Sequence, residues 1–383
     1  MTGRGRAVLA LAVACYLAAW TLGSRPLYPV AVGLGLAVAL SIVWVRLSAQ
    51  PMRLRRETGR HAQFEGEVVP VRLTIEPSTR VLPPSLVVEE RIGRLGLRAT
   101  TLDRLRGAYL LDAVPRGRYP FERSRALIGD PFGLAAAEIQ LQAPGSLLVR
   151  PRVVAVRRLF SDAGVHRAGG ARQLVRRPAG LDVHGVREWV EGESLRHVHW
   201  GSTAKTGRLM VKEVEDTPRD EVAILLDARS GVPAAVFDVQ VRAAASLLRA
   251  YASRHRETRL LVNARWLESH TVRSLGSDWE AALDVLAGVE ADGRTPLEAL
   301  LAEDGAGVRS LELVVVTASL RRTLVERLVR LTAARRPVSA VFVAESHALE
   351  PELVRLQTAG AAVTVVRPGA DLRAALEGGG AAG

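Results

Sequence analysis

Residues 222–227 read VAILLD, a continuous apolar run that ends in an acidic residue. Two similar runs follow, LELVVVT at 311–317 and VSAVFV at 338–343, and amphipathic segments at 234–253 and 320–334 separate the three. Apolar runs without alternation indicate strands that are buried on both faces. Because these strands alternate with helix-length segments, the sequence predicts a doubly wound, mostly parallel α/β sheet.

The predicted α/β domain covers residues 220–370. Its further strands are predicted at 259–263, 270–275 and 362–366. In doubly wound sheets, ligands bind outside the carboxyl ends of the strands. Asp227 ends the first apolar run, so it is the first candidate for a functional site in this domain.

A domain of antiparallel β-structure is predicted over residues 64–150. Short β-prone segments recur there, separated by Pro, Gly and Asp at intervals of about 8–12 residues. The segments are 68–75, 86–91, 108–114 and 147–150. We interpret this pattern as a small immunoglobulin-like β-sandwich, which makes the whole chain an α+β multidomain protein.

The N-terminus predicts a transmembrane helical hairpin over residues 1–46. Apolar runs at 7–22 and 27–45 are separated only by Gly23–Pro26. A membrane-spanning helix needs roughly 17–25 residues, so the second run qualifies and the first is marginal. A cleaved signal peptide is the alternative for the first run. The short spacing between the runs favours the hairpin.

Arginines flank the two runs at the ends away from the short loop. The flanking arginines are Arg4, Arg6, Arg46, Arg53, Arg55, Arg56 and Arg60, and the loop has only Arg25. By the positive-inside rule, both ends of the hairpin and everything after residue 46 are expected in the cytoplasm. The chain is therefore predicted to be a multi-pass protein of the cell membrane, and its juxtamembrane arginines suit anionic lipid.

The chain has 383 residues, a formal net charge of +12 and one cysteine, Cys15. A single cysteine excludes an intrachain disulfide and a cysteine metal site. The charge favours anionic partners. Aromatic residues are few and are not interleaved with the basic ones, so nucleic-acid binding is not predicted. Residues 151–219 are interpreted as a basic linker and a motif-bearing segment, and residues 371–383 as a flexible tail.

Residues 180–213, hereafter the signature segment, read GLDVHGVREWVEGESLRHVHWGSTAKTGRLMVKE. They resemble the core signature of the domain-of-unknown-function-58 family. The matching pieces are Gly180-Leu181-Asp182, Arg187-Glu188, Gly192, Arg196, Trp200, Ala204-Lys205 and Arg208-Leu209. Upstream, RGRY at 116–119 and GDPFGL at 129–134 resemble other parts of the same family. Trp189 and Glu193 stand where the family usually has Tyr and Asp. The resemblance covers nearly the whole chain.

The resemblance implies a von Willebrand A-like fold for residues 220–370. It also implies association with a MoxR-type AAA+ ATPase, and often with a membrane transglutaminase-like protein. The metal site of A-type domains uses an Asp-x-Ser-x-Ser motif, a threonine and a further aspartate. Asp227 and Thr295 match this pattern, whereas Arg229, Gly231 and Ala318 replace the other ligands. We therefore expect a degenerate site that binds no metal.

The histidines of the signature segment permit a metal-site interpretation. His197 and His199 are two residues apart, and His184 could be a third ligand. Arg196 would repel a cation next to them. We therefore favour a role for these histidines in polar packing and hydrogen bonding.

Two further motif matches are weaker. Ser202-x-x-Lys205 and Lys205-Thr206-Gly207 match motifs of penicillin-binding proteins, but both use Lys205, so we regard the match as coincidence. A phosphate-binding loop would need a glycine where Ala204 stands.

A structural interpretation explains the signature segment better. Its arginines and acidic residues can form a hydrogen-bonded network around Trp189 and Trp200, because arginine pairs with carboxylates and stacks on indole rings. Such a network would dock the segment against the α/β domain or display a rigid surface to a partner. The candidate interaction residues are Asp182, Arg187, Glu188, Trp189, Gly192, Arg196, His199, Trp200 and Lys205.

These features predict a membrane-anchored, non-enzymatic adaptor or scaffold, without catalytic residues or a cofactor. It would work with the ATPase in the assembly or maturation of other proteins. The alternative is a hydrolase or metal-dependent enzyme that uses the histidine-rich signature segment.

Overall fold

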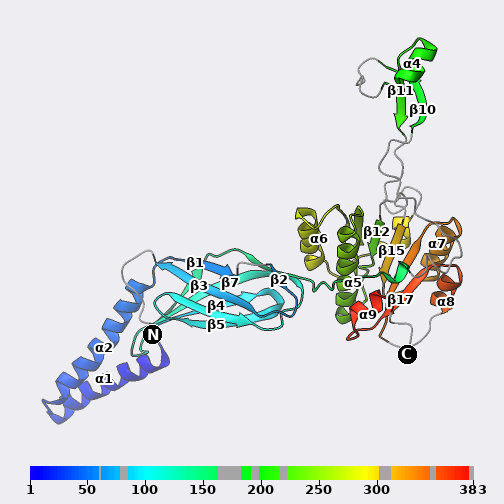
Figure 1. Ribbon diagram of the computed structural model, residues 1–383. Coiled ribbons are helices and arrows are strands. Elements are labelled where there is room, and N and C mark those ends of the chain that lie inside the picture. Colours follow the sequence, from blue (N-terminus) through cyan, green and yellow to red (C-terminus); the bar gives the residue numbers. More distant parts are fainter. Residues whose placement is uncertain are drawn as a thin grey trace. The chain divides into compact units, whose positions relative to one another are not determined.

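The computed structural model describes residues 1–59, 62–77, 85–162, 183–190, 198–214, 222–301, 312–345 and 351–378. The chain divides into two compact units, Met1–Arg152 and Val153–Gly383 (Figure 1). Two N-terminal apolar helices are followed by β-sheet structure in the first unit and by a mixed α/β sheet in the second. This order confirms the predicted α+β layout at the level of its elements.

The first unit begins with helices α1 (Gly3–Leu22) and α2 (Leu27–Ser48). Both are long and apolar enough to cross a membrane. At 1.5 Å per residue they are about 30 Å long, the thickness of a bilayer's hydrocarbon core. The rings of Tyr16 and Tyr28 contact each other edge to face at 5.6 Å between centroids. The two membrane-length helices that the sequence predicts are therefore present.

Two β-sheets form the rest of the first unit. One has the order β1-β3-β6 and the other β2-β9-β7-β4-β5, with β8 added to β7. The elements are β1 (Met52–Thr58), β2 (Gln63–Phe64), β3 (Val69–Pro77), β4 (Ser85–Ile92), η1 (Gly93–Leu95), β5 (Gly96–Leu102), β6 (Arg106–Leu111), β7 (Gly117–Gly129), β8 (Ala136–Leu141) and β9 (Ser146–Arg150). Both sheets contribute to one hydrophobic core, in which Leu73 and Ile128 are buried.

The β-structure starts at Met52, not at the predicted boundary of residue 64. The missed strand, β1, reads MRLRRET, and its arginines hide its alternation. Met52 and Leu54 are buried in the core. The next inward position is Arg56, so the strand carries a charged residue where an apolar one would have revealed it.

Arg56 lies in the core of the first unit and not among the lipid-facing arginines that the sequence suggested. Its guanidinium donates to the Glu90 carboxylate, to Ser124 Oγ at 2.7 Å and to the Ala143 carbonyl at 2.6 Å. The side chains of Arg56 and Glu90 are 8% and 0% exposed. Tyr109 donates its hydroxyl to the other Glu90 oxygen at 2.7 Å. Burial beside this carboxylate raises the pKa of Tyr109.

The second unit is built on a six-stranded sheet with the order β14-β13-β12-β15-β16-β17. The strands are β12 (Val222–Leu226), β13 (Thr258–Asn263), β14 (Leu267–Val272), β15 (Glu312–Thr317), β16 (Val338–Val343) and β17 (Ala362–Val366). Only β14 pairs antiparallel among them, at one edge. The mostly parallel sheet is therefore as predicted, although β14 begins three residues before the predicted segment 270–275, directly after a tight turn.

Helices cover both faces of this sheet. They are α5 (Ala234–Ser253), α6 (Ser277–Gly288), η3 (Leu297–Leu301), α7 (Arg322–Ala333), α8 (Pro351–Thr358) and α9 (Leu372–Leu376). Figure 1 shows α5 and α6 on one side of the strands and α7 and α8 on the other. Ala223 and Leu225 of β12 pack with Leu324 of α7 and Leu353 of α8 in one core. The separate pair β10 (Val183–Glu188) and β11 (Met210–Val214) flanks α4 (Trp200–Thr206) in the sequence.

Parts of the predicted linker and tail belong to the second unit. Leu159 and Phe160 are buried, and the Val154 N–H donates to Ser246 Oγ of α5 at 3.1 Å. Leu376 is fully buried, and Asp371 caps α9. The composition indicated a basic linker and a flexible tail, but a few well-spaced apolar residues suffice to anchor these parts of the two stretches. Residues 163–182 and 379–383 lie outside the described residues.

Candidate functional site

Three polar residues lie in a row at the carboxyl edge of the six-stranded sheet. The parallel register pairs Leu226 of β12 with Val262 of β13 and Val316 of β15. The residues that follow these three are Asp227 directly after β12, Asn263 at the end of β13 and Thr317 at the end of β15. They therefore lie next to one another at the edge of the sheet. These side chains are 2%, 1% and 0% exposed. The row is the place where ligands bind in sheets of this kind.

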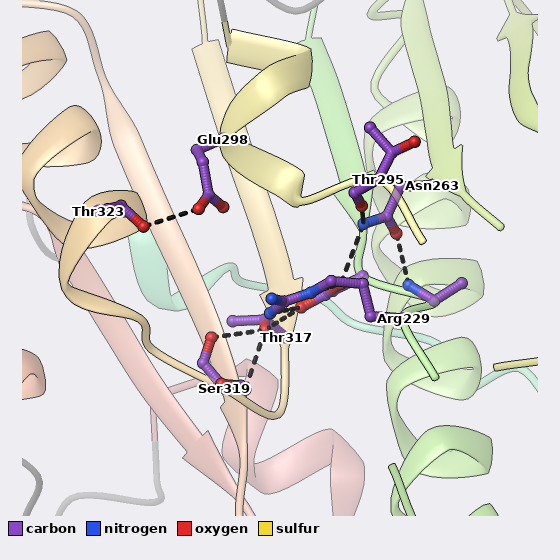
Figure 2. Close-up of polar contacts among 9 residues, drawn as sticks. Arg229, Asn263, Thr295, Glu298, Thr317, Ser319 and Thr323 are labelled. Carbon is purple, nitrogen blue, oxygen red and sulfur yellow. Dashed lines mark hydrogen bonds and ion pairs between the residues drawn. The ribbon is translucent and has the colours of Figure 1, made fainter. Parts of the chain in front are cut away.

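The Asp227 carboxylate accepts four hydrogen bonds. Arg229 donates Nε to Oδ1 at 3.0 Å and Nη2 to Oδ2 at 2.9 Å. Asn263 Nδ2 donates to Oδ1 at 3.1 Å, and Thr317 Oγ1 donates to Oδ2 at 2.7 Å. A carboxylate has about four lone-pair sites. Each oxygen thus has two donors, and the acceptor capacity of Asp227 is filled. We call these four residues the carboxylate cluster; Figure 2 labels its three donors, Arg229, Asn263 and Thr317.

The donors keep Asp227 ionised inside the protein. Burial alone would raise the pKa of Asp227, but the hydrogen bonds from Arg229, Thr317 and Asn263 outweigh burial and hold the pKa below its ordinary value. The hydrogen bonds to Asp227 raise the pKa of Arg229, and the nearby charge of Glu298 acts in the same direction. Glu298 is itself fixed by the Thr323 hydroxyl at 2.7 Å (Figure 2). The cluster is therefore a buried ion pair with a second acidic group close by.

A glycine holds the neighbouring loop against the cluster. The Gly293 N–H donates to the Ala228 carbonyl at 2.9 Å, and a Cβ on Gly293 would lie 1.9 Å from the Asn263 carbonyl oxygen. Only glycine permits this approach. The loop then brings the Thr295 carbonyl to Asn263 Nδ2 at 3.0 Å. Asn263 also accepts the Ala228 N–H at 2.6 Å, so its amide is used on both sides.

The cluster differs from the metal site that the family resemblance suggested. Thr295 contributes its backbone carbonyl, while its side chain is exposed. The threonine hydroxyl that reaches Asp227 belongs to Thr317, which the sequence argument missed. The Arg229 guanidinium occupies the charged position beside Asp227, so the residues do not fit a divalent cation, which needs free oxygen ligands. The described residues hold no group of three or more His, Cys, Asp or Glu side chains that could bind a metal ion.

The described part of the signature segment forms a small module of β10, β11 and α4. Strands β10 and β11 pair antiparallel, with Arg187 opposite Val211. His199 caps α4: its Nδ1 accepts the Ser202 N–H at 3.1 Å and lies 2.8 Å from Ser202 Oγ. The His199 N–H donates to the Met210 carbonyl at 2.7 Å and so joins the helix to β11. His199 is therefore a structural residue of this module.

The other predicted interaction residues have different environments. Glu188 pairs with Arg208 at 2.6 Å, and both side chains are largely exposed. Trp189 is half-buried and Lys205 is exposed. Trp200 is 67% exposed, so it is not packed inside a charge network as one interpretation required. Asp182, Gly192 and Arg196, as well as the side chain of Arg187, lie outside the described part of the chain.

Comparisons with known proteins add little. Neither protein-family models nor curated proteins give a match. A solved structure of proximal thread matrix protein 1 from the mussel byssus is 12% identical over 42% of this chain and 46% of its own length, with a TM-score of 0.31. A conjugative transposon lipoprotein from Bacteroides eggerthii is 10% identical over 24% of this chain and 98% of its own length, with a TM-score of 0.15. Such low scores carry no argument about fold or function.

Proposed function

We propose that the chain is a membrane-anchored, non-enzymatic adaptor of the domain-of-unknown-function-58 type, with an immunoglobulin-like β-domain and a von Willebrand A-like α/β domain. Its soluble part lies in the cytoplasm. It recruits a MoxR-type AAA+ ATPase through the module of β10, β11 and α4, and the complex acts in the assembly or maturation of other proteins.

The exposed Trp200 is the observation that carries this proposal. Trp200 is 67% exposed and Val190, on the same module, is 60% exposed. The Trp189 N–H donates to the Leu209 carbonyl and the His199 N–H to the Met210 carbonyl, so the residues after β10 and before α4 are both bonded to the chain at the start of β11. A tryptophan on a rigid, solvent-facing support is the residue type most enriched at the centres of protein interfaces.

The carboxylate cluster supports a binding role over catalysis for the α/β domain. A general base or metal ligand needs a free lone pair, whereas the four donors to Asp227 use all of its acceptor sites. The cluster instead fixes the strand ends and the loop at Gly293 as a rigid surface. Asp227 is thus assigned a structural role.

The charge distribution supports the cytoplasmic orientation. Thr2, just before α1, and Ser41, in the second half of α2, both contact the loop that joins β7 and β8. The N-terminal end of α1 and the C-terminal half of α2 are therefore both next to the β-domain. Arg4 and Arg6 lie in the first turn of α1 and Arg46 lies in the last turn of α2, which is the arrangement that the positive-inside rule assigns to the cytoplasm.

A hydrolase is the second candidate, because Ser202 Oγ lies 2.8 Å from His199 Nδ1. This distance would suit a nucleophile and its base. The same nitrogen, however, accepts the Ser202 N–H as a helix cap, which accounts for the contact without catalysis. Ser202→Ala separates the two candidates, since it removes a nucleophile but leaves the capping N–H in place.

The proposal is tested by capture from membranes with the full-length chain as bait. Wild type is compared with Trp200→Ala and with Trp266→Ala, a control tryptophan that is 74% exposed in the turn between β13 and β14. We expect an AAA+ ATPase, identified by mass spectrometry, with wild type and Trp266→Ala, and its loss with Trp200→Ala. Equal capture by both variants would refute docking through this module. Loss of cellular function with Ser202→Ala, at normal ATPase capture, would favour the hydrolase.

A further inference from the structure

The loop between β7 and β8 is held in one conformation by Asp130. The Asp130 carboxylate accepts the N–H groups of Phe132 at 2.9 Å and Ala135 at 2.6 Å, together with the hydroxyl of Ser41 in α2 at 3.1 Å. Burial would raise the pKa of Asp130, but these donors outweigh it and lower the pKa below its ordinary value. The loop is therefore a rigid, ionised turn that is fixed to a membrane-length helix.

The same loop is also fixed to the first helix. The Thr2 N–H donates to the Leu134 carbonyl at 3.0 Å, and the Thr2 hydroxyl donates to the Gly133 carbonyl at 2.6 Å. A Cβ on Gly5 of α1 would lie 2.0 Å from the Leu134 carbonyl oxygen. The helix backbone thus touches the loop directly, at a distance that only glycine permits.

The attachment points put the loop at the depth of the membrane boundary. Ser41 lies about 20 Å along α2 from its first residue, at 1.5 Å per residue. Ser41 is seven residues, or about 10 Å, from the last residue of α2, so it lies toward the end of the helix that carries Arg46. The exposed apolar side chains of α2 indeed continue to Trp44 and Leu47, which are 48% and 53% exposed. Ser41 itself is 5% exposed and faces the loop, so the loop lies beside the last two turns of this apolar helix.

A neighbouring arginine marks the level of the headgroups. An ideal Cβ on Gly133 would lie 3.7 Å from Arg4 Nη1, so the Arg4 guanidinium is next to the loop. Arginines at the ends of membrane helices direct their charge to the phosphate layer. The loop is thus at the boundary between headgroups and acyl chains, where Trp, Phe and Leu side chains of interfacial segments insert.

We propose that Phe132, at the tip of this loop, inserts into the membrane boundary as an anchor separate from the two helices. Phe132 is 73% exposed, although its N–H is bound by Asp130 in a turn that is fixed to α2. A lipid partner is favoured because the loop that carries Phe132 is bonded to both ends of the apolar hairpin, and its next residue, Gly133, lies beside Arg4. The inference rests on the proposed membrane anchoring. It adds that the β-domain is attached to the bilayer at a fixed orientation.

Spin-label depth measurements on the full-length chain in nanodiscs test this inference. A label on Phe132→Cys, in a Cys15→Ala background, is compared with one on Leu97→Cys in the same background. Leu97 is also apolar and exposed, at 56%, and its strand register puts it about 20 Å along the sheet from Gly129. A label on the native Cys15 of α1 reports membrane insertion itself.

We expect the label at position 132 to be several-fold less accessible to a water-soluble nickel chelate than the label at position 97. We also expect it to be several-fold more accessible to oxygen. If the Phe132 and Leu97 labels are equally accessible to nickel while the Cys15 label lies in lipid, the inference is wrong and the hairpin anchor stands. If the Cys15 label is also in water, the anchoring itself is refuted.

Discussion

Arg229→Ala removes two of the four hydrogen bonds that Asp227 accepts and leaves a buried carboxylate without its counter-charge. Breaking a buried ion pair in this way costs about 3–5 kcal/mol, because the remaining charge is stranded in the interior. Asp227 is 2% exposed in the intact protein, and water that enters the space left by the guanidinium would replace its hydrogen bonds but not its charge. The loss should be confined to the second unit, where the carboxylate cluster joins β12, β13 and β15.

Hydrogen exchange of the β12 and β15 amides, followed in the full-length chain, measures this loss. The expected destabilisation corresponds to a fall in protection of about a hundred-fold to a few thousand-fold. Arg254→Ala is the matched control, since Arg254 pairs with Asp162 in the same unit but the two side chains are 33% and 50% exposed. A pair of this exposure contributes about 1 kcal/mol or less.

Hydrogen exchange in the presence of magnesium tests whether the Arg229 guanidinium takes the place of a metal ion. If the guanidinium stands in for a cation, Arg229→Ala should gain protection in excess magnesium, by about 2.7 kcal/mol at 100 times Kd. Wild type should gain none. Magnesium-dependent protection of wild type that Asp227→Ala removes would refute this account of the cluster, as would an Arg229→Ala variant as stable as Arg254→Ala.

Three other predictions concern the first unit and its topology. Arg56→Ala should cost about 3–5 kcal/mol, because it strands the buried Glu90, whereas the exposed neighbour Arg55→Ala should stay within about 0.5 kcal/mol in denaturant titration. The pKa of Asp130 is lower in the folded state than in the unfolded chain, where it is about 3.9. Ionised Asp130 therefore stabilises the fold at pH values above about 3.9, and this contribution is lost as pH falls through the lower pKa of the folded state. Asp130→Asn should therefore flatten the acid dependence of stability below about pH 4, and an unchanged profile would contradict the assignment. A reporter fused after residue 60 should be located in the cytoplasm, and one inserted in the loop at 23–26 should be located outside. Activity at residue 60 of a reporter that works only in the periplasm would exclude the hairpin.

The sequence predicts the α/β sheet well because its strands are buried on both faces. The runs VAILLD and VSAVFV and the helix at 234–253 match β12, β16 and α5 within a residue. Strand β1 is not predicted because Arg56 takes an inward position, where a charged residue is not expected. The residue that makes this possible, Glu90, lies on another strand, and no local pattern reveals the pairing. Its burial is a tertiary property.

Three of the four residues of the carboxylate cluster could be found from the sequence. Asp227 was identified because it ends an apolar run. Asn263 and Thr317 end neighbouring runs in the same way, so aligning the run ends in a parallel sheet would have predicted the whole row. Thr295 was chosen by motif spacing, which cannot tell a side-chain donor from a backbone carbonyl. That Arg229 turns back onto Asp227 depends on the loop at Gly293, and only the fold reveals it.

Direct binding tests the adaptor proposal most sharply. The AAA+ ATPase captured from membranes is purified and titrated onto the full-length chain in nanodiscs, as wild type, Trp200→Ala and Trp266→Ala. An interface hot spot is worth about 2 kcal/mol or more, so Trp200→Ala should weaken Kd by about 30-fold or more. Trp266→Ala, with an equally exposed indole, should change Kd less than about 2-fold. Equal affinities for all three proteins, or no binding by wild type, would contradict the proposal that this chain recruits the ATPase through Trp200.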